Sequence, residues 1–196
     1  MADRKASVGR KTSETDIRLE LNLDGGGRAA VSTGIGFFDH MLTLFAVHGF
    51  FDLEVAAHGD LEVDAHHTVE DVGLALGDAV AGALGDRRGI RRYGQAATPM
   101  DDALAVVTID LSNRPFLVWH LPPGDFAAGS FDAPLAKEFF RALSNRGGMN
   151  LHVELPYGEN GHHVLEAIFK SLGRALDQAV GREPRLRSVR SSKGVL

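Results

Sequence analysis

The chain has no cysteine, which excludes a disulfide framework and any metal site built on thiolates. His, Asp and Glu are therefore the only strong metal ligands left to consider. A basic excess is also missing: the formal net charge is −5, which argues against a general nucleic-acid binder, because neutralising phosphates requires many Lys and Arg residues. No apolar run approaches the length of a membrane span, so no membrane partner is expected.

What remains is the composition of an ordinary globular protein, with 44% hydrophobic and 24% charged residues. A length of 196 residues suits one domain with a sizeable core, or two small similar halves. The first eleven residues are polar and basic, with no apolar stretch behind them. We interpret them as a solvated terminus without a secretory signal, and we expect a cytoplasmic location.

An internal repeat organises the chain. The segments 37–80 and 138–180 carry the same features in the same order: an aromatic pair, a short alternating stretch, a His-His-x-x-Glu motif, and a helical pattern containing Leu-Gly or Gly-Leu. Each copy predicts helix, strand, helix, and further strands are expected ahead of the copies at 16–23, 29–32, 103–111 and 115–120. The segment 127–130 is interpreted as a loop.

This repeat predicts an α+β fold of two repeated halves, each a small β-sheet with helices on one face. We place the first half at 1–90 and the second at 91–196, where the second ends in a C-terminal tail. The junction lies in the Gly- and Arg-rich stretch 85–94.

The repeated motif predicts metal binding. It reads His66-His67-x-x-Glu70 in the first copy and His162-His163-x-x-Glu166 in the second. On a helix either His can share a face with the Glu, but adjacent side chains diverge by about 100° around the axis. The two histidines of a pair should therefore serve different ions, which indicates two ions in all. Imidazole and carboxylate ligands fit Mn, Fe, Co, Ni or Zn.

The repeat also pairs His40 with Glu138, because each stands beside a Phe-Phe sequence ahead of the motif. Both are candidate ligands. We interpret His58, His120 and His152 as structural or surface residues, since none repeats together with a carboxylate.

Six motifs in this order resemble the imidazoleglycerol-phosphate dehydratase family over essentially the whole chain. They comprise Arg10, Thr12, Glu14 and Thr15, followed by the segments 36–41, 64–71, 99–101, 161–167 and 191–194. The resemblance implies a fold similar to the second domain of ribosomal protein S5. It also implies self-association into a hollow shell of roughly 24 subunits built from trimers, with active sites between subunits.

The resemblance further implies two manganese ions per active site, with ligands to each ion drawn from more than one chain. By matching positions, one ion would be held by His40, His67, His162 and Glu166, and the other by His66, Glu70 and His163. The sequence departs from the family at Glu138, where many members carry a histidine that ligates the second ion. A carboxylate can replace imidazole around Mn²⁺, so Glu138 remains a predicted ligand.

The implied reaction is the dehydration of D-erythro-imidazole glycerol phosphate to imidazole acetol phosphate in histidine biosynthesis. The C–H bond to be broken is not adjacent to a carbonyl, so two ions on the ring nitrogens would stabilise an imidazolate. We expect Glu166 to be the base, with Glu14 second; Glu14 could instead bind a substrate hydroxyl. His40 completes the predicted catalytic set.

Further residues are predicted to bind the substrate. His48 lies two helical turns beyond His40 and would line the pocket. A phosphate needs cationic and hydroxyl donors, and the family positions are matched by Arg92, Arg114, Lys170, Ser191, Ser192 and Lys193.

Three other functions remain open from the sequence. The His-Glu sites could link subunits of a structural or storage shell, in which case phosphate-binding residues would be unnecessary. The chain could be an RNA-associated protein, although its negative charge and few aromatic residues count against this. It could also be a different metal-dependent hydrolase or lyase.

Overall fold

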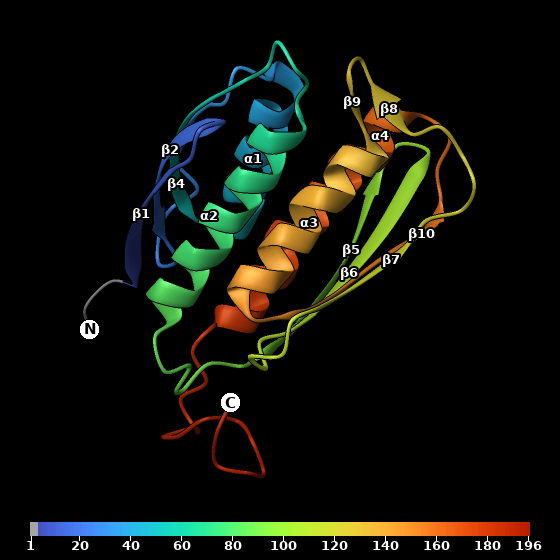
Figure 1. Ribbon diagram of the computed structural model, residues 1–196. Helices are drawn as coiled ribbons and strands as arrows, with labels where there is room; N and C mark the ends of the chain where they lie inside the picture. Colours follow the sequence, from blue (N-terminus) through green and yellow to red (C-terminus); the bar gives the residue numbers. More distant parts are fainter. Residues whose placement is uncertain (1–3) are drawn as a thin grey trace.

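The computed structural model describes residues 4–196 (Figure 1). Residues 1–3, which belong to the segment interpreted as a solvated terminus, lie outside this range. The first half of the chain forms β1 (Lys5–Lys11), β2 (Thr15–Asn22), β3 (Ala29–Ser32), α1 (Gly36–Gly49), β4 (Asp52–Gly59) and α2 (His66–Leu84). The second half forms β5 (Tyr93–Met100), β6 (Ala103–Asp110), β7 (Phe116–His120), β8 (Ala127–Ala128), β9 (Phe131–Asp132), α3 (Ala133–Gly147), β10 (Asn150–Tyr157) and α4 (Gly161–Val180).

The topology of the two sheets confirms the predicted duplication. The first sheet has the strand order β1-β2-β4-β3 and the second has the order β5-β6-β10-β7. In the first sheet β3 pairs in parallel with β4, and in the second β7 pairs in parallel with β10. Strands β4 and β10 directly precede α2 and α4, the long helices of the two halves. The β8–β9 hairpin is an insertion in the second half, so the α+β fold of two similar halves holds with one addition.

Three local expectations are corrected. The segment 127–130 is not a simple loop, because Ala127–Ala128 pairs with Phe131–Asp132. Strands β1 and β5 were not predicted. The N-terminal segment is not a solvated terminus over its described part: β1 pairs with β2 along its whole length, and the Arg4 side chain is held by Asp24 and by the Val180 carbonyl.

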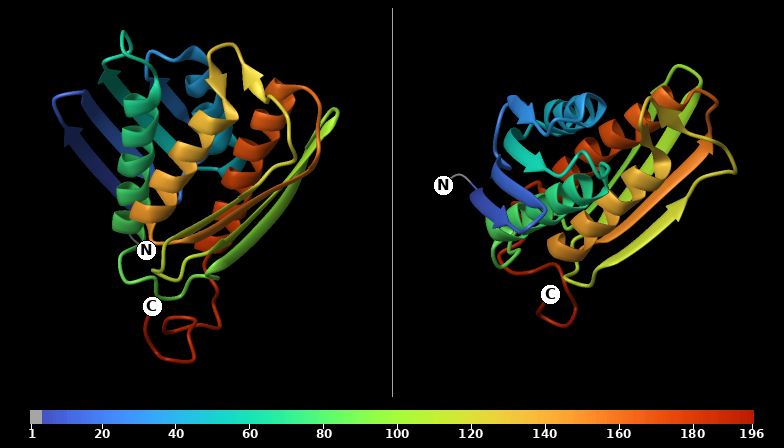
Figure 2. Two further views of the ribbon diagram at one scale, coloured as in Figure 1. Left: turned by 45° about the vertical axis from the view of Figure 1, so that its right-hand side comes forward. Right: turned by 45° about the horizontal axis from the view of Figure 1, so that its top comes forward.

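The four helices lie between the two sheets, so that each sheet is covered on one face only (Figure 2). Strand residues alternate between this buried face and the outer face, as in β6, where every second residue is fully buried. The interior is filled by phenylalanines from both halves. Phe38 of α1, for example, packs against Phe139 of α3 and Phe169 of α4, so the halves share one core.

Glycines allow the helices of the two halves to approach closely. A Cβ at Gly173 of α4 would lie 2.4 Å from the carbonyl oxygen of Phe45 in α1. A Cβ at Gly73 of α2 would lie 2.7 Å from the Phe139 carbonyl oxygen in α3. The α1–α4 contact places the first half of α1, which carries His40, beside the start of α4, which carries the histidines of the second motif.

The segment that joins the halves is held by the C-terminal tail. The predicted boundary at 90/91 falls between α2 and β5, and Ile90 forms an isolated bridge with Arg182 of the tail. Arg92 makes a bidentate ion pair with Asp110, and its third nitrogen donates to the Arg190 carbonyl. Over the described residues, no helix is long and apolar enough to span a bilayer.

We predict opposite effects for two Gly→Ala substitutions within helices. Gly173→Ala should lower the free energy of unfolding by about 1–3 kcal/mol or more, because its methyl group would push α1 away from α4. Gly82→Ala should raise it by about 0.5–1 kcal/mol, because a Cβ there would meet only the Ala6 methyl group at an ordinary contact distance of 3.5 Å and alanine is the better helix former. Urea unfolding curves measure both, and equal stabilisation by the two changes would refute the close-contact account.

Candidate metal centre

Both His-His-x-x-Glu motifs lie in the first turns of helices, as expected. At the start of α4, the Asn160 side chain accepts hydrogen bonds from the backbone N–H groups of His162 and His163. At the start of α2, Asp64 accepts one from the His66 N–H. These hydrogen bonds hold the backbone of the first turn in place. The helix geometry then sets the direction in which each histidine side chain leaves the backbone.

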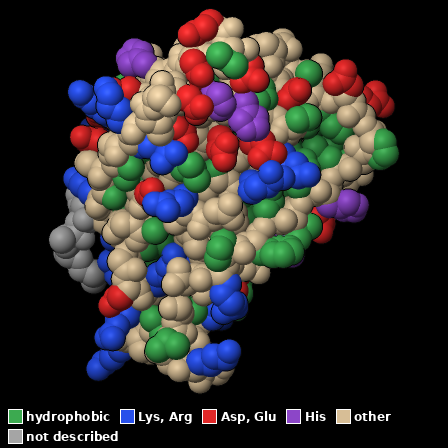
Figure 3. All heavy atoms as spheres, viewed as in Figure 1, with side chains coloured by type: hydrophobic (Ala, Val, Ile, Leu, Met, Phe, Trp, Pro, Cys, Tyr) green, Lys and Arg blue, Asp and Glu red, His purple; other side chains and the backbone are tan. Residues whose placement is uncertain are grey.

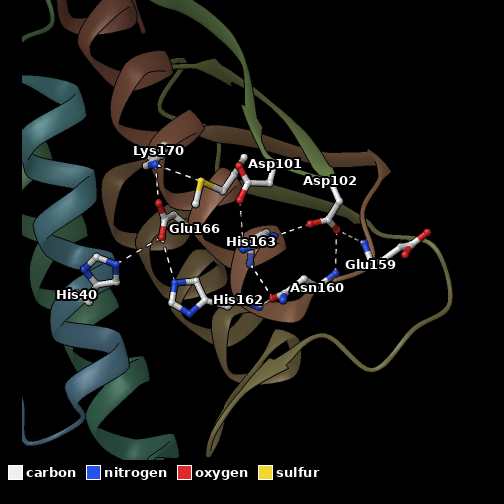
Figure 4. Close-up of polar contacts among 10 residues, drawn as sticks. His40, Asp101, Asp102, Glu159, Asn160, His162, His163, Glu166 and Lys170 are labelled. Atoms are coloured by element: carbon white, nitrogen blue, oxygen red, sulfur yellow. Dashed lines mark hydrogen bonds and ion pairs between the residues drawn. The ribbon is translucent and has the colours of Figure 1, made fainter.

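One compact cluster joins the two halves of the chain. Nε2 of His40, from α1, lies 3.4 Å from Oε2 of Glu166, and Nε2 of His162 lies 3.2 Å from the same oxygen (Figure 4). Phe37 packs its ring edge-on against both imidazoles, with centroids 6.5 Å and 5.1 Å away. The ligand atoms of the three polar side chains all lie within 4.8 Å of one another.

The second oxygen of Glu166 is paired with Lys170, at 2.5 Å between Oε1 and Nζ. The Glu166 side chain is only 8% exposed. Its burial alone would raise the pKa, but the Lys170 ammonium and the hydrogen bonds to the two histidines outweigh this and lower the pKa of Glu166. The carboxylate is therefore ionised at neutral pH and has one oxygen directed at the histidines.

This donor set fits a first-row metal ion. Two ligand atoms about 2.1 Å from an ion, at right angles to each other, lie roughly 3 Å apart. The separations of 3.2 Å and 3.4 Å are close to this value. Two imidazole nitrogens and one carboxylate oxygen could therefore bind one ion after a small adjustment, with coordination positions left for other groups.

The remaining motif residues point elsewhere. Nε2 of His66 lies 3.4 Å from Oε2 of Glu70, on the exposed first turn of α2. The rings of His66 and His67 are inclined by 87°, and those of His162 and His163 by 75°. Adjacent histidines thus diverge as predicted. Among residues 4–196, His40, His162 and Glu166 form the one group of three or more His, Asp or Glu side chains whose ligand atoms lie close enough to share an ion.

The second histidine of each motif is held by an aspartate. Nδ1 of His67 lies 3.0 Å from Asp60, and Nδ1 of His163 lies 2.5 Å from Asp102. These hydrogen bonds raise the pKa of both histidines. The pKa of Asp102 is lowered by His163 and by the backbone N–H groups of Glu159 and Asn160.

Comparison with known proteins identifies the family of the chain. The family model for imidazoleglycerol-phosphate dehydratase matches residues 33–176. A relative from Syntrophobacter fumaroxidans with this name is 58% identical over 193 residues, which cover 98% of each chain. One from Desulfitobacterium hafniense is 56% identical over the full length of both. The chain belongs to the imidazoleglycerol-phosphate dehydratase family.

Solved structures of family members agree in fold. The protein from Staphylococcus aureus has a TM-score of 0.82 at 35% identity, covering 91% of this chain and 99% of its own. The protein from Pyrococcus furiosus has a TM-score of 0.83 at 38% identity, covering 96% and 100% respectively. The two-sheet arrangement with inner helices is therefore the fold of this family.

Not all of the site residues that the family resemblance implied come together within one chain. Glu138 lies on α3 and pairs with Arg141 at 2.6 Å, outside the cluster of His40, His162 and Glu166. Its role as a ligand stays a prediction. Glu14, in the β1–β2 turn, lies 3.8 Å from Nδ1 of His67.

His48 lies in the last turn of α1, near charged side chains of α4. Its pKa is lowered by burial and by the nearby charges of Lys170 and Arg174. A neutral imidazole close to two cations is compatible with the predicted position lining the pocket, next to a phosphate or another anionic group.

The predicted phosphate-binding residues are divided between two ends of the molecule. Histidines and carboxylates gather at the end where α2 and α4 begin, and Lys and Arg predominate around the tail at the other end (Figures 1 and 3). Lys170 lies near the histidine end. Arg92, Arg114 and the tail residues Ser191, Ser192 and Lys193 lie at the opposite end, beyond a 20-residue α4 that spans about 30 Å.

Sequence reasoning missed Asp60 and Asp102. Both lie in turns outside the repeated motif and outside the helices, so helical periodicity does not place either of them beside the histidine that it contacts. A partial signal existed, because Pro99-Met100-Asp101 belongs to the segments that resemble the family, but no role was attached to it. Asp101 itself lies 3.6 Å from Nε2 of His163.

Proposed function

We propose that the chain dehydrates imidazole glycerol phosphate to imidazole acetol phosphate, as the names of its relatives indicate. The main support for this proposal is the duplicated His-His-x-x-Glu motif. In its second copy, His162 and the His40 side chain from the other half both lie close to the same oxygen of Glu166. That arrangement could hold a metal ion near the start of α4, and the family resemblance suggests the substrate.

The metal in this proposal is manganese, with two ions per active site. His40, His162 and Glu166 would hold one ion, and His66 and Glu70 offer ligand atoms for another. Ions bound at the two nitrogens of the substrate imidazole would draw electron density from the ring and so make loss of the adjacent C–H proton easier. His67 and His163 point away from these pairs and remain available to ligate ions shared with another subunit.

The proton from that C–H bond needs a base with a free oxygen. Both oxygens of Glu166 have partners: one faces Lys170 and the other faces His40 and His162. Glu14 is 51% exposed and is held at its turn by Thr12, whose hydroxyl accepts the Glu14 N–H. We therefore propose Glu14 as the base and Glu166 as a metal ligand, which reverses the order suggested by the sequence.

The proposed active site lies between subunits. A small phosphorylated imidazole cannot touch both the histidine end and the tail end of one chain, because α4 separates them by about 30 Å. If Arg114 and Lys193 bind its phosphate, they come from a neighbouring chain. This division supports the expected self-association into a shell built from trimers. The positions of His67 and His163, outside the cluster of His40, His162 and Glu166, also support it.

The first experiment measures turnover of imidazole glycerol phosphate by metal-stripped protein before and after addition of Mn²⁺. We expect activity only with metal. Glu14→Gln should lower kcat by about 10²–10⁴-fold while Mn²⁺ binding is retained, as for loss of a general base. Glu166→Gln should weaken Mn²⁺ binding itself.

Measurement of bound Mn²⁺ in each variant separates the two roles. Loss of metal in Glu14→Gln, with full metal occupancy but no turnover in Glu166→Gln, would return the role of base to Glu166. No turnover by manganese-loaded, assembled wild-type protein would overturn the enzyme assignment.

The position of the site between chains is tested by mixing two inactive variants. Glu166→Gln removes a ligand at the histidine end, and Lys193→Ala removes a cation at the tail end. If each site draws on the histidine end of one chain and the tail of another, co-expressed variants form some intact sites and activity returns. Sites contained in one chain would leave the mixture as inactive as its components.

A further inference from the structure

Two aspartates in turns each contact the second histidine of a motif in the same way. In both pairs the aspartate meets Nδ1 of the imidazole, so Nε2 is on the side of the ring away from that aspartate. Nε2 of His163 lies 3.6 Å from Asp101, which is 71% exposed. His67 meets Asp60, which directly follows β4, and His163 meets Asp102, in the β5–β6 turn (Figure 4). A carboxylate at Nδ1 fixes the proton there, so that Nε2 carries a lone pair.

The two aspartates do not occupy equivalent positions in the repeat. Asp60 is the first residue after β4, whereas the first residue after β10, the matching strand, is Gly158. The second half supplies its carboxylate from the turn between its first two strands, where the first half has Glu14. Glu14 itself lies 3.8 Å from Nδ1 of His67, beyond hydrogen-bond distance, so Asp60 makes the hydrogen bond there. The second histidine of each motif is therefore hydrogen-bonded to an aspartate, although the two aspartates occupy different positions in the repeat.

Both contacts are partly shielded from solvent. The side chains of Asp60 and His67 are 20% and 34% exposed, and those of His163 and Asp102 are 26% and 34% exposed. Asp102 is also fixed from behind, because its other oxygen accepts the backbone N–H groups of Glu159 and Asn160 at 2.7 Å and 2.9 Å. It thus joins the loop before α4 to the histidine at the start of that helix.

We infer that Asp60 and Asp102 are positioning residues that hold His67 and His163 in the Nδ1–H form and direct Nε2 of each toward a metal ion. The inference rests on the proposed metal-dependent function and adds two residues to it. The pattern is consistent across the site, since His40, His66 and His162 also present Nε2 to the carboxylates of the motifs.

The test measures Mn²⁺ affinity from the electron paramagnetic resonance signal of free Mn²⁺ during titration of the full-length, assembled protein. Asp60→Ala and Asp102→Ala should each weaken binding by about 10–100-fold, the usual cost of losing such a partner. The matched control is Asp78→Ala, which removes an ion pair to Arg146 on α3 and should leave the affinity unchanged.

Asp60→Asn separates hydrogen bonding from packing. Within residues 4–196 the Asp60 carboxylate hydrogen-bonds to His67 alone, so an amide oxygen at this position can still accept the Nδ1–H. We expect Asp60→Asn to regain most of the affinity that Asp60→Ala loses. Pulsed resonance spectra should also show the ¹⁴N coupling of one imidazole lost in Asp60→Ala and restored in Asp60→Asn.

The outcomes distinguish this inference from the proposed function. If wild-type protein binds no Mn²⁺, the metal assignment itself fails. If wild-type protein binds Mn²⁺ and turns over substrate, but both Ala variants bind as tightly as Asp78→Ala with unchanged ¹⁴N couplings, the two aspartates are only structural and the inference is overturned.

Discussion

The close contact between α1 and α4 is the constraint on which the site depends. Gly173 lets the two helices approach so closely that a Cβ at this position would lie 2.4 Å from the Phe45 carbonyl oxygen, and a larger residue would separate them. The same contact places His40, on the second turn of α1, 3.4 Å from Glu166 on α4. A metal centre made by both halves thus requires the helices to lie inside, between the two sheets, where they can touch.

The sequence predicted the parts of the fold that have strong local signals. The duplicated motif, the aromatic pairs and the long helical patterns were enough to give two α+β halves. Strands β1 and β5 escaped prediction because their residues, as in Tyr93–Met100, are small, polar or proline and have weak β propensity. Their place is decided by pairing with β2 and β6, which is a tertiary effect.

The candidate site was predictable only in part, for a related reason. Helical spacing identifies His162 and Glu166 as neighbours, and it shows that adjacent histidines diverge. It says nothing about Asp60 or Asp102, because a turn residue reaches its histidine through the fold. It also could not show that Arg92 is engaged by Asp110 and by the tail, far from the histidines of its own chain.

We propose that the duplicated motif, together with His40, binds manganese. Anomalous diffraction at the manganese edge, from crystals of the assembled protein grown with Mn²⁺, would locate the ions. We expect one peak bonded to Nε2 of His40, Nε2 of His162 and Oε2 of Glu166, and a second beside His66 and Glu70. Active, manganese-loaded protein whose anomalous peaks lie away from these side chains would contradict it.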